Sequence, residues 1–299
     1  MIYIFGFYKF KKIYKLKSNK KFLQNLLIGN KTRGTIILSR EGINGNIAGN
    51  LINLKKLSLV FKKKFRFKNF DSNHISMSLF QPFHKARVKI KKEVVPMNFK
   101  ILNRLKKNNY IEPKNWNKLI KNRETLLIDV RKPFEYKVGS FKNSINPEVK
   151  NFREFPNYLK KLKKDKTIAM FCTGGIRCEK ASNYLYKKGF KNIYMLKGGI
   201  INYFNKIEPK KNKWNGECFV FDNRVTLKKN ATQGSYGICN ACRMPISKKD
   251  KRSIKYKIGL SCPKCYDNLS DEQIKRFTIR HKQIINSKIK YKFRKNDLK

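Results

Sequence analysis

A cysteine placed between a strand and a helix constrains this chain more than any other feature of its sequence. Residues 167–171, TIAMF, have the β-branched and apolar composition of a buried strand, and residues 179–188 follow a helical pattern. Between them lies the loop Cys172-Thr-Gly-Gly-Ile-Arg177. Two glycines let the backbone turn tightly with its N–H groups inward, and the helix that follows adds the positive end of its dipole. Because such a cradle stabilises a thiolate, the pattern predicts a nucleophilic cysteine with a lowered pKa.

The size of this loop indicates which group it holds. Its Cys-x4-Arg spacing is one residue shorter than the Cys-x5-Arg cradle that would enclose a tetrahedral phosphate, so we expect a single sulfur atom, as in a persulfide on Cys172. The competing interpretation is a buried, inert cysteine at a strand end. We expect the catalytic residues to be Cys172 and Arg177, the latter pairing with the anionic or persulfide sulfur, although such arginines also serve in helix N-terminal networks. The loop itself is formed by Thr173, Gly174, Gly175 and Ile176. The next residue, Cys178, is a possible second thiol that resolves a persulfide, or it packs against the sheet.

The loop and its flanks resemble the active-site region of a rhodanese domain. Upstream, LLIDVRKPFEYKVGSFKNSINP (126–147) is similar to the rhodanese strand-turn segment, and downstream MLKGGIINYF (195–204) is similar to its closing Gly-Gly segment. The upstream segment departs from the usual Gly-His, since Ser140 and Phe141 follow Gly139. We expect Asp129 and Glu135 to fix the loops around the cysteine rather than to act as acids.

The first part of the chain, residues 1–95, has the pattern of a ferredoxin-like α+β domain. We predict four strands, at 2–8, 34–39, 75–80 and 87–94, and two helices, at 20–27 and 51–61. Between the second strand and the second helix, residues 40–49 are predicted to be a loop, which lies within the segment SREGINGNIAG (39–49). It either approaches a phosphate or partner closely, or is a strand-to-helix turn that needs glycine. A linker, residues 96–111, follows this domain.

Strands and helices alternate in the next part, residues 112–208. The predicted strands are 126–130, 167–171 and 192–195, and the predicted helices are 152–162 and 179–188. This alternation predicts an α/β rhodanese domain, with a parallel sheet covered by helices on both faces. It also places Cys172 at the carboxyl end of a strand, where ligands bind in open α/β sheets.

Four cysteines mark the last part, residues 209–299, as a small Cys-rich basic module that begins with a strand-like run at 214–227. Two Cys-x2-Cys pairs, separated by the 19 residues 243–261, have the spacing of a zinc ribbon. The candidate ligands of a structural Zn²⁺ are Cys239, Cys242, Cys262 and Cys265. A reduced cluster without metal or a redox pair is the alternative. Cys218, in an apolar run, is expected to be buried.

The chain is strongly basic. Its 72 Lys and Arg residues against 19 Asp and Glu residues give a formal net charge of +53. Such a surface attracts polyanions, of which RNA is the obvious one, although an AT-rich genome inflates lysine without any function. No apolar run reaches the roughly 20 residues that span a bilayer, so we expect no membrane association. We expect a cytoplasmic protein whose thiols stay reduced.

Taken together, SREGINGNIAG, CTGGIRCEKAS (172–182), WNGECFVFDNRV (214–225) and the paired cysteines resemble the bacterial tRNA uridine hydroxylase family over nearly the full length. The resemblance implies oxygen-dependent conversion of the wobble uridine in the tRNA anticodon loop to 5-hydroxyuridine, with molecular oxygen as co-substrate and Cys172 as the essential cysteine. The residues themselves show no flavin or NAD signature and no two-His-one-carboxylate triad. Two alternatives stay open, a sulfurtransferase that passes persulfide sulfur from Cys172 to an acceptor, and an RNA-binding module without catalysis.

Overall fold

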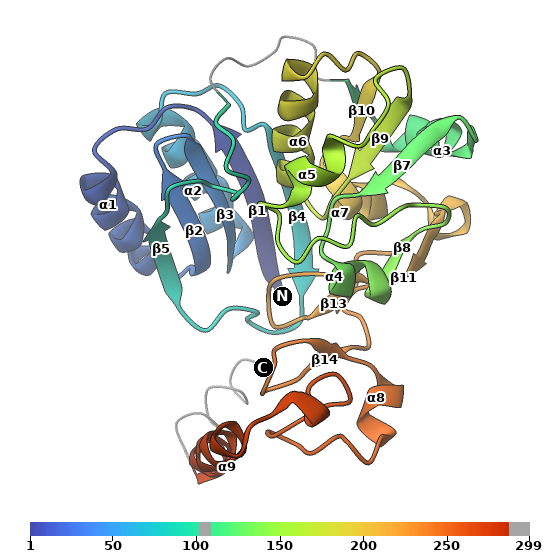
Figure 1. The fold of residues 1–299 in the computed structure, drawn as a ribbon. Helices are drawn as coiled ribbons and strands as arrows, with labels where there is room; N and C mark the ends of the chain where they lie inside the picture. The colour runs from blue at the N-terminus through green and yellow to red at the C-terminus, as the bar shows by residue number, and fades with distance from the viewer. Residues whose placement is uncertain (102–108, 287–299) are drawn as a thin grey trace.

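The computed structural model describes residues 1–101 and 109–286, and these form three parts (Figure 1). An α+β part comes first, a parallel α/β part second and a Cys-rich part last, which confirms the predicted fold class. Residues 102–108 of the predicted linker and residues 287–299 of the predicted Cys-rich module lie outside the described residues. Within the described residues, no helix is both long and apolar enough to cross a bilayer.

The N-terminal sheet has helices on one face only (Figure 1). Its elements are β1 (Ile2–Phe10), α1 (Leu16–Gly29), β2 (Arg33–Ser39), β3 (Gly42–Gly49), α2 (Leu51–Lys64), β4 (Ser72–Ser78) and β5 (Ala86–Ile90). The strand order is β4-β1-β3-β2-β5, with β5 parallel to β2 and the other neighbours antiparallel. Because side chains alternate along a strand, Phe5 and Phe7 pack with Leu23 of α1 and Leu57 of α2, and the residues between them face the opposite side.

Strand β3, in the middle of this sheet, corrects the prediction of a loop at 40–49. Residues 42–49 pair with both β1 and β2, and only the turn at 40–41 connects β2 to β3. The glycines concealed this strand because glycine weakens strand propensity, yet Gly42 is required here. A Cβ atom at Gly42 would come within 2.1 Å of the Lys9 carbonyl oxygen. The signal that could have identified β3 is its period-two pattern, with Ile43 and Ile47 buried and Asn44 and Asn46 between them on the other face.

The second part is a parallel sheet with a hydrophobic core on each face. Its elements are β6 (Tyr110–Ile111), α3 (Pro113–Lys121), β7 (Thr125–Asp129), α4 (Pro133–Val138), β8 (Gly139–Phe141), α5 (Phe155–Leu159), β9 (Thr167–Phe171), α6 (Ile176–Lys187), β10 (Ile193–Leu196) and α7 (Gly199–Lys206). The sheet order is β6-β10-β9-β7, all parallel. Met170 points into the core under α5 and α6, and its neighbour Phe171 into the core under α3 and α7. Helices therefore cover both faces, as predicted, although the helix expected at 152–162 is the shorter α5.

The last part first extends the α/β core and then forms the Cys-rich region. The 3₁₀ helix η1 (Pro209–Lys211) leads to β11 (Trp214–Gly216), which pairs antiparallel with β8, so that Trp214 stacks edge-on against Phe141. The run 214–227, predicted to be strand-like, is divided into three short strands, β11, β12 (Cys218–Phe219) and β13 (Thr226–Leu227). The remaining elements are β14 (Gly237–Ile238), β15 (Pro245–Ile246), α8 (Lys248–Arg252), η2 (Tyr266–Asn268) and α9 (Asp271–Asn286).

A buried lysine ties the first two parts together. Lys180 of α6 is fully buried, and its ammonium group lies 2.9 and 3.0 Å from the carboxylate oxygens of Glu41 and 2.5 Å from that of Glu93. It also donates to the Val95 carbonyl at 2.9 Å. The β2–β3 turn that carries Glu41 is therefore attached to the helix that follows the Cys172 loop, which fixes the N-terminal sheet against that loop.

Candidate active site

Cys172 stands between the end of β9 and the start of α6, and only 1 % of its surface is exposed. The N–H of Gly175 donates a hydrogen bond to the Cys172 sulfur at 3.2 Å. Gly175 has a φ of +98°, a conformation that favours glycine, so its identity is what lets this N–H turn inward. The loop is held from behind by Gly199, whose missing Cβ lets α7 approach and whose neighbour Ile200 donates to the Cys172 carbonyl at 3.0 Å.

The surroundings of Cys172 favour its thiolate. Burial alone would raise the pKa of this thiol. A hydrogen bond from the Cys178 thiol, the positive charge of Arg177 and the backbone N–H groups of Cys178 and Arg177 outweigh burial, and they lower the pKa from an ordinary value of 9.0 to about 6. At neutral pH most Cys172 side chains are therefore ionised, which is the form that acts as a nucleophile.

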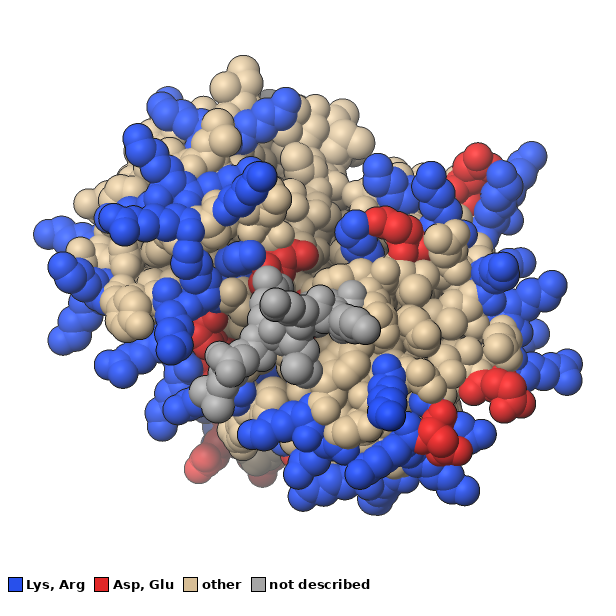
Figure 2. Space-filling view, turned by 90° about the horizontal axis from the view of Figure 1, so that it is seen from above, with Lys and Arg blue, Asp and Glu red and all other residues tan. Residues whose placement is uncertain are grey.

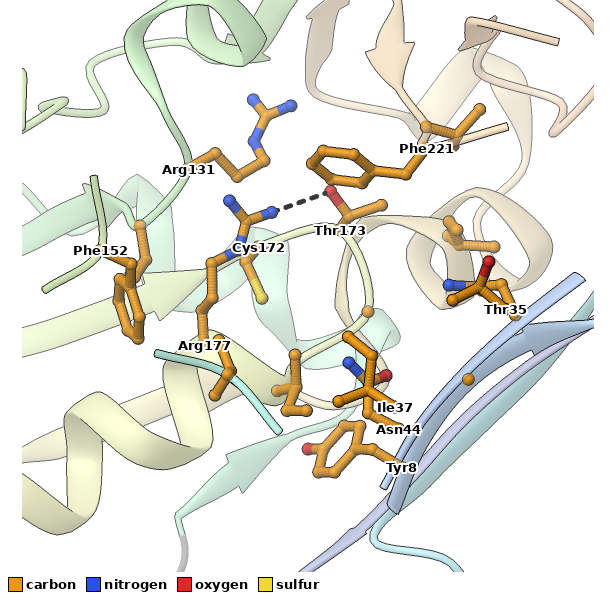
Figure 3. A pocket seen from close by; sticks show the side chains of 18 of the residues that line it. Tyr8, Thr35, Ile37, Asn44, Arg131, Phe152, Cys172, Thr173, Arg177 and Phe221 are labelled. Carbon is orange, nitrogen blue, oxygen red and sulfur yellow. Dashed lines mark hydrogen bonds between the residues drawn. The ribbon is translucent and has the colours of Figure 1, made fainter. Parts of the chain in front are cut away.

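Arg177 is held by an acid rather than by the sulfur. Its guanidinium donates to Glu135 of α4 through two hydrogen bonds, at 2.7 and 2.9 Å. It also donates to the Thr173 hydroxyl at 3.4 Å, the bond drawn in Figure 3. Burial would raise the pKa of Glu135, but the Arg177 charge lowers it below its ordinary value. Arg177 thus reaches the sulfur through its charge, and Glu135 fixes the position of that charge.

The two other buried thiols near the loop are protonated. Burial raises the pKa of Cys178 well above its ordinary value, and its hydrogen bond to Cys172 adds to this increase. Burial likewise raises the pKa of Cys218, on β12, to about 12. Cys178 therefore serves Cys172 as a hydrogen-bond donor, and Cys218 belongs to the hydrophobic core that contains Trp214.

Asp129, at the end of β7, organises the neighbouring loop. It accepts two hydrogen bonds from the Arg131 guanidinium, at 2.9 and 2.6 Å, and one from the Ser140 hydroxyl at 2.7 Å. Ser140 also lies 2.8 Å from the Ser144 hydroxyl. Ser140, which follows Gly139, thus joins a buried network that fixes the side chain of Arg131.

Cys172 lines a cavity of about 640 Å³, a size typical of small-molecule sites. Three parts of the chain enclose it: the helix-free face of the N-terminal sheet, the loops at the carboxyl ends of β7 and β9, and the segment 220–224 (Figure 3). Of the predicted site residues, Cys172, Thr173, Gly174, Ile176 and Arg177 line it. Gly175 instead contributes its backbone to the cradle around the sulfur.

Several lining residues were missed by the sequence analysis because they come from other parts of the chain. The most distinctive are Tyr8, Asn44, Asn46, His74, Phe221 and Arg224. Tyr8 and Asn44 are partners on adjacent strands, and the Tyr8 hydroxyl reaches Glu179 at 3.4 Å, next to the loop. Only the alternation of polar side chains on β3 could have suggested that this sheet face is a binding surface.

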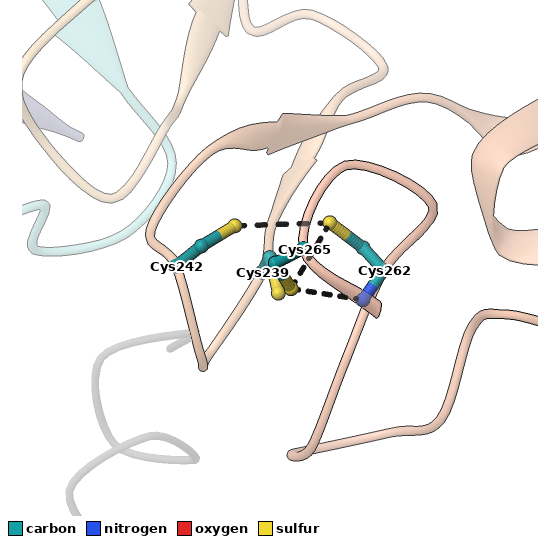
Figure 4. A group of neighbouring side chains, drawn as sticks. All are labelled: Cys239, Cys242, Cys262 and Cys265. Carbon is teal, nitrogen blue, oxygen red and sulfur yellow. Dashed lines mark hydrogen bonds between the residues drawn. The ribbon is translucent and has the colours of Figure 1, made fainter. Parts of the chain in front are cut away.

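The four cysteines of the last part converge, as their spacing predicts (Figure 4). Their sulfur atoms lie within 4.8 Å of one another, and two of the separations are 3.7 Å (Cys242–Cys262) and 3.8 Å (Cys262–Cys265). A tetrahedral Zn²⁺ with bonds of about 2.3 Å needs sulfur atoms about 3.8 Å apart. This cluster could therefore hold a metal ion.

Positive charge covers the surface broadly. On the face shown in Figure 2, Lys and Arg side chains spread over both sides of the molecule, and Asp and Glu are few. Charge alone therefore does not locate a binding site for a polyanion. The cavity lined by Cys172 is the more specific indication of where a substrate binds.

Comparison with known proteins gives two matches to sequence families. Residues 2–94 match the family described as UPF0176 acylphosphatase like domain, and residues 112–206 match the rhodanese-like domain. The tRNA uridine(34) hydroxylase of Pelagibacter ubique is 59% identical over 284 residues, which cover 95% of this chain and 94% of the relative.

Two solved structures are similar to about a third of this chain. A rhodanese-related protein from Thermoplasma volcanium is 31% identical, with a TM-score of 0.29, and the match covers 34% of this chain and 95% of that protein. A single-domain sulfurtransferase from Saccharomyces cerevisiae is 23% identical, with a TM-score of 0.30, and the match covers 34% of this chain and 92% of that protein.

Proposed function

Because this chain belongs to the tRNA uridine(34) hydroxylase family, we propose that it is a tRNA-modifying enzyme that converts the wobble uridine to 5-hydroxyuridine. The relative is similar along nearly the whole chain, so the proposal covers all three parts of the molecule. The observation that carries it is the position of Cys172, an ionised thiol that lines a cavity large enough for a nucleoside. The basic surface would gather the tRNA, whose anticodon loop can present an unstacked base.

Molecular oxygen is the co-substrate in this proposal. Replacing the hydrogen at C5 of uracil by a hydroxyl group is a two-electron oxidation, so the reaction belongs to the oxidoreductases. One oxygen atom of dioxygen enters the ring, and the other leaves as water after taking two protons and two electrons from a two-electron reductant such as a dithiol. We assign the chemistry to Cys172, as thiolate or as a persulfide formed on it. Arg177 is a positioning residue that keeps positive charge beside the sulfur. The enclosed cavity would keep bulk water away from the reacting base.

The four-cysteine cluster would hold a structural Zn²⁺. Its sulfur separations fit tetrahedral zinc, and four protein ligands leave no open position for catalysis. The ion would fix the fold of the residues that follow Gly237, where the hydrophobic cluster is small. Free thiols and a tRNA substrate both agree with a cytoplasmic location.

Nucleoside analysis of tRNA tests the proposed activity. A strain that lacks the gene is complemented with the native chain, with Cys172→Ala or with Cys218→Ala as a matched buried-thiol control. We expect mass spectrometry to find 5-hydroxyuridine with the native chain and the control but not with Cys172→Ala. Growth under isotopically labelled dioxygen should place the label in the nucleoside. Native levels of 5-hydroxyuridine with Cys172→Ala would refute the role of this cysteine.

The same loop keeps sulfur transfer as the second candidate. A six-residue cradle with a low thiol pKa also suits a persulfide that passes its sulfur to an acceptor. The nucleoside analysis separates the two reactions, because a sulfurtransferase acting on tRNA predicts the loss of a thiolated nucleoside and no loss of 5-hydroxyuridine.

A further inference from the structure

The inner wall of the cavity beside Cys172 is largely neutralised, in contrast to the rest of this basic molecule. Four arginines line the cavity, and three of them each donate at least two hydrogen bonds to one carboxylate. The pairs are Arg131 with Asp129, Arg177 with Glu135 and Arg224 with Asp222. With only 19 acidic residues in the chain, three are placed where they neutralise these arginines. A phosphate would find no free positive charge from these three arginines, whereas an uncharged heterocycle fits such a site.

Asn44 offers this cavity a hydrogen-bond acceptor of fixed orientation. Its Nδ2 donates to the Val94 carbonyl at 3.3 Å, so the opposite atom of the amide must be the oxygen. Among the described residues no donor is bonded to that Oδ1. Asn44 is the strand partner of Tyr8, whose hydroxyl lies beside Gly175, and in Figure 3 both residues stand across from the Cys172 sulfur. A ring held at the sulfur can therefore present its far edge to this acceptor.

The adjoining part of the cavity wall is polar and uncharged as well. Gly6 separates His74 from Asn46 on the neighbouring strands, and a Cβ at Gly6 would come within 2.7 Å of both side chains. Burial, aided by the charge of Arg224, lowers the pKa of His74 to about 4, so its ring is neutral at physiological pH. The same ring reaches the Cys172 loop, since its Cε1 lies 3.5 Å from the Cβ position of Gly174.

An exposed aromatic ring and two exposed cations lie at the rim. Phe221 is 62% exposed although it lines the cavity, and it is supported by Phe219, whose ring centroid is 5.1 Å away. Exposed aromatics beside a binding site are the usual stacking platforms for RNA bases. Lys132 and Arg153 are exposed at the same cavity and could take phosphates outside it.

We propose that the cavity binds an extruded uracil base of single-stranded RNA, that Asn44 selects uracil by accepting a hydrogen bond from its N3–H, and that Phe221 stacks on a base at the rim. This inference rests on the proposed function for the identity of the RNA. Cytosine has no hydrogen at N3 and sets an acceptor against Asn44 Oδ1. With cytosine, Asn44 Oδ1 would therefore lack a hydrogen-bond donor, and one such unsatisfied polar contact typically lowers binding affinity about tenfold.

Binding in the absence of turnover tests this site. The full chain carrying Cys172→Ala is titrated into a fluorescent anticodon stem-loop with uridine or cytidine at the wobble position, and anisotropy gives both affinities. We expect a preference for uridine of about tenfold. Adding Asn44→Ala should remove that preference, whereas Asn73→Ala, an exposed asparagine of β4 that does not line the cavity, should leave it unchanged.

Phe221 gives a second, independent readout. Phe221→Ala should weaken both stem-loops equally, by about tenfold, and Phe221→Tyr should restore binding because it keeps the stacking surface. The inference is overturned if Asn44→Ala keeps the uridine preference, or if Phe221→Ala binds like the parent. Neither result would contradict the hydroxylase proposal, which is tested separately by the loss of 5-hydroxyuridine from cells that carry Cys172→Ala. Conversely, uridine selection without any 5-hydroxyuridine in cells would retain the base site and reject the hydroxylase.

Discussion

Arg177 and Glu135 form a bidentate ion pair beside the Cys172 loop. Nη1 of Arg177 lies 2.7 Å from Oε2 of Glu135, and Nη2 lies 2.9 Å from Oε1. The Glu135 side chain is fully buried and that of Arg177 is 12% exposed. The planar fork of an arginine pairs rigidly with a carboxylate, so the guanidinium cannot turn away from the loop. Glu135 therefore fixes the position of the Arg177 guanidinium relative to Cys172.

Removing Glu135 should be costly to folding. Glu135→Ala leaves the Arg177 guanidinium without its partner in a buried site, and losing one member of a buried pair typically destabilises a protein by about 3–5 kcal/mol. Urea denaturation should show this loss in the free energy of unfolding. The matched control is Glu112→Ala, which breaks an exposed ion pair with Lys197 and should cost about 0–1 kcal/mol. Equal losses for the two variants would contradict the proposed importance of the buried pair.

The reactivity of Cys172 should depend on pH with a midpoint near 6. Its folded-state pKa is about 6, so the thiol is protonated and slow to react below this pH and becomes a thiolate above it. Iodoacetamide labelling at several pH values, followed by peptide mass spectrometry, measures the midpoint. Arg177→Met removes a charge that lowers this pKa, so its midpoint should move upward. A native midpoint near the ordinary thiol value of 9.0 would show that the cradle does not stabilise the thiolate.

Cys178 is the internal reference in the same labelling experiment. Burial and the Cys172 thiolate both raise its pKa well above the ordinary value, so it should stay unlabelled over the whole range. Cys178→Ala removes a hydrogen bond that stabilises the Cys172 thiolate, and the Cys172 midpoint should rise in this variant too. Labelling of Cys178 before Cys172 would reverse the assignment of the nucleophile.

Zinc removal should loosen the Cys-rich region and leave the α/β core folded. A thiol-modifying reagent should release the bound zinc, and a colorimetric indicator should then measure about one zinc ion per chain, since four cysteines make one site. Limited proteolysis should then cut after Gly237, because the local hydrophobic cluster is small without the ion. Cys262→Ser should show the same proteolysis without treatment. A chain that contains no zinc when purified under reducing conditions would argue for a metal-free thiol cluster.

The sequence allowed the Cys172 loop to be predicted because all of its parts are contiguous. A strand, two glycines and a helix within about twenty residues define the cradle, and the paired cysteines define the metal cluster in the same way. Asn44, His74 and Phe221 could not be found this way, since only tertiary packing brings them to Cys172. The ion pair of Arg177 with Glu135 could not be found in this way either, because the local pattern shows the sulfur nearby but not the acid forty-two residues earlier.

Strand β3 shows the limit of local propensity within the fold. Its glycines favour a loop, yet the β1 backbone at Gly42 and the side chains of Phe7 (β1) and Ile36 (β2) at Gly45 lie so close that small residues are needed there. Tertiary pairing thus overrides the preference of the individual residues. The prediction of the α+β and α/β architecture was still correct, because the longer periodic segments before and after β3 were assigned to the right kind of element.

Lys180 should be essential for holding the N-terminal sheet against the Cys172 loop. In Lys180→Met the carboxylates of Glu41 and Glu93 lose the cation that lies between them, and both become partly buried charges held by backbone N–H groups alone. We expect a loss of about 3–5 kcal/mol in the free energy of unfolding at pH 7, whereas Lys191→Met, an exposed lysine, should change it little. Urea denaturation of both variants measures the difference.

The same variant should lose less stability in acid. Burial already raises the pKa of Glu41 above its ordinary value even with Lys180 present, and without the lysine the folded-state pKa of Glu41 should lie still further above the unfolded one. A raised carboxyl pKa gives a penalty that grows as pH rises from the unfolded value toward the folded one, and that disappears once the group is protonated. The gap between Lys180→Met and the native chain should therefore be smaller at pH 5 than at pH 7. A gap that is constant over this range would mean that Lys180 stabilises the interface through packing of its aliphatic stem rather than by its charge.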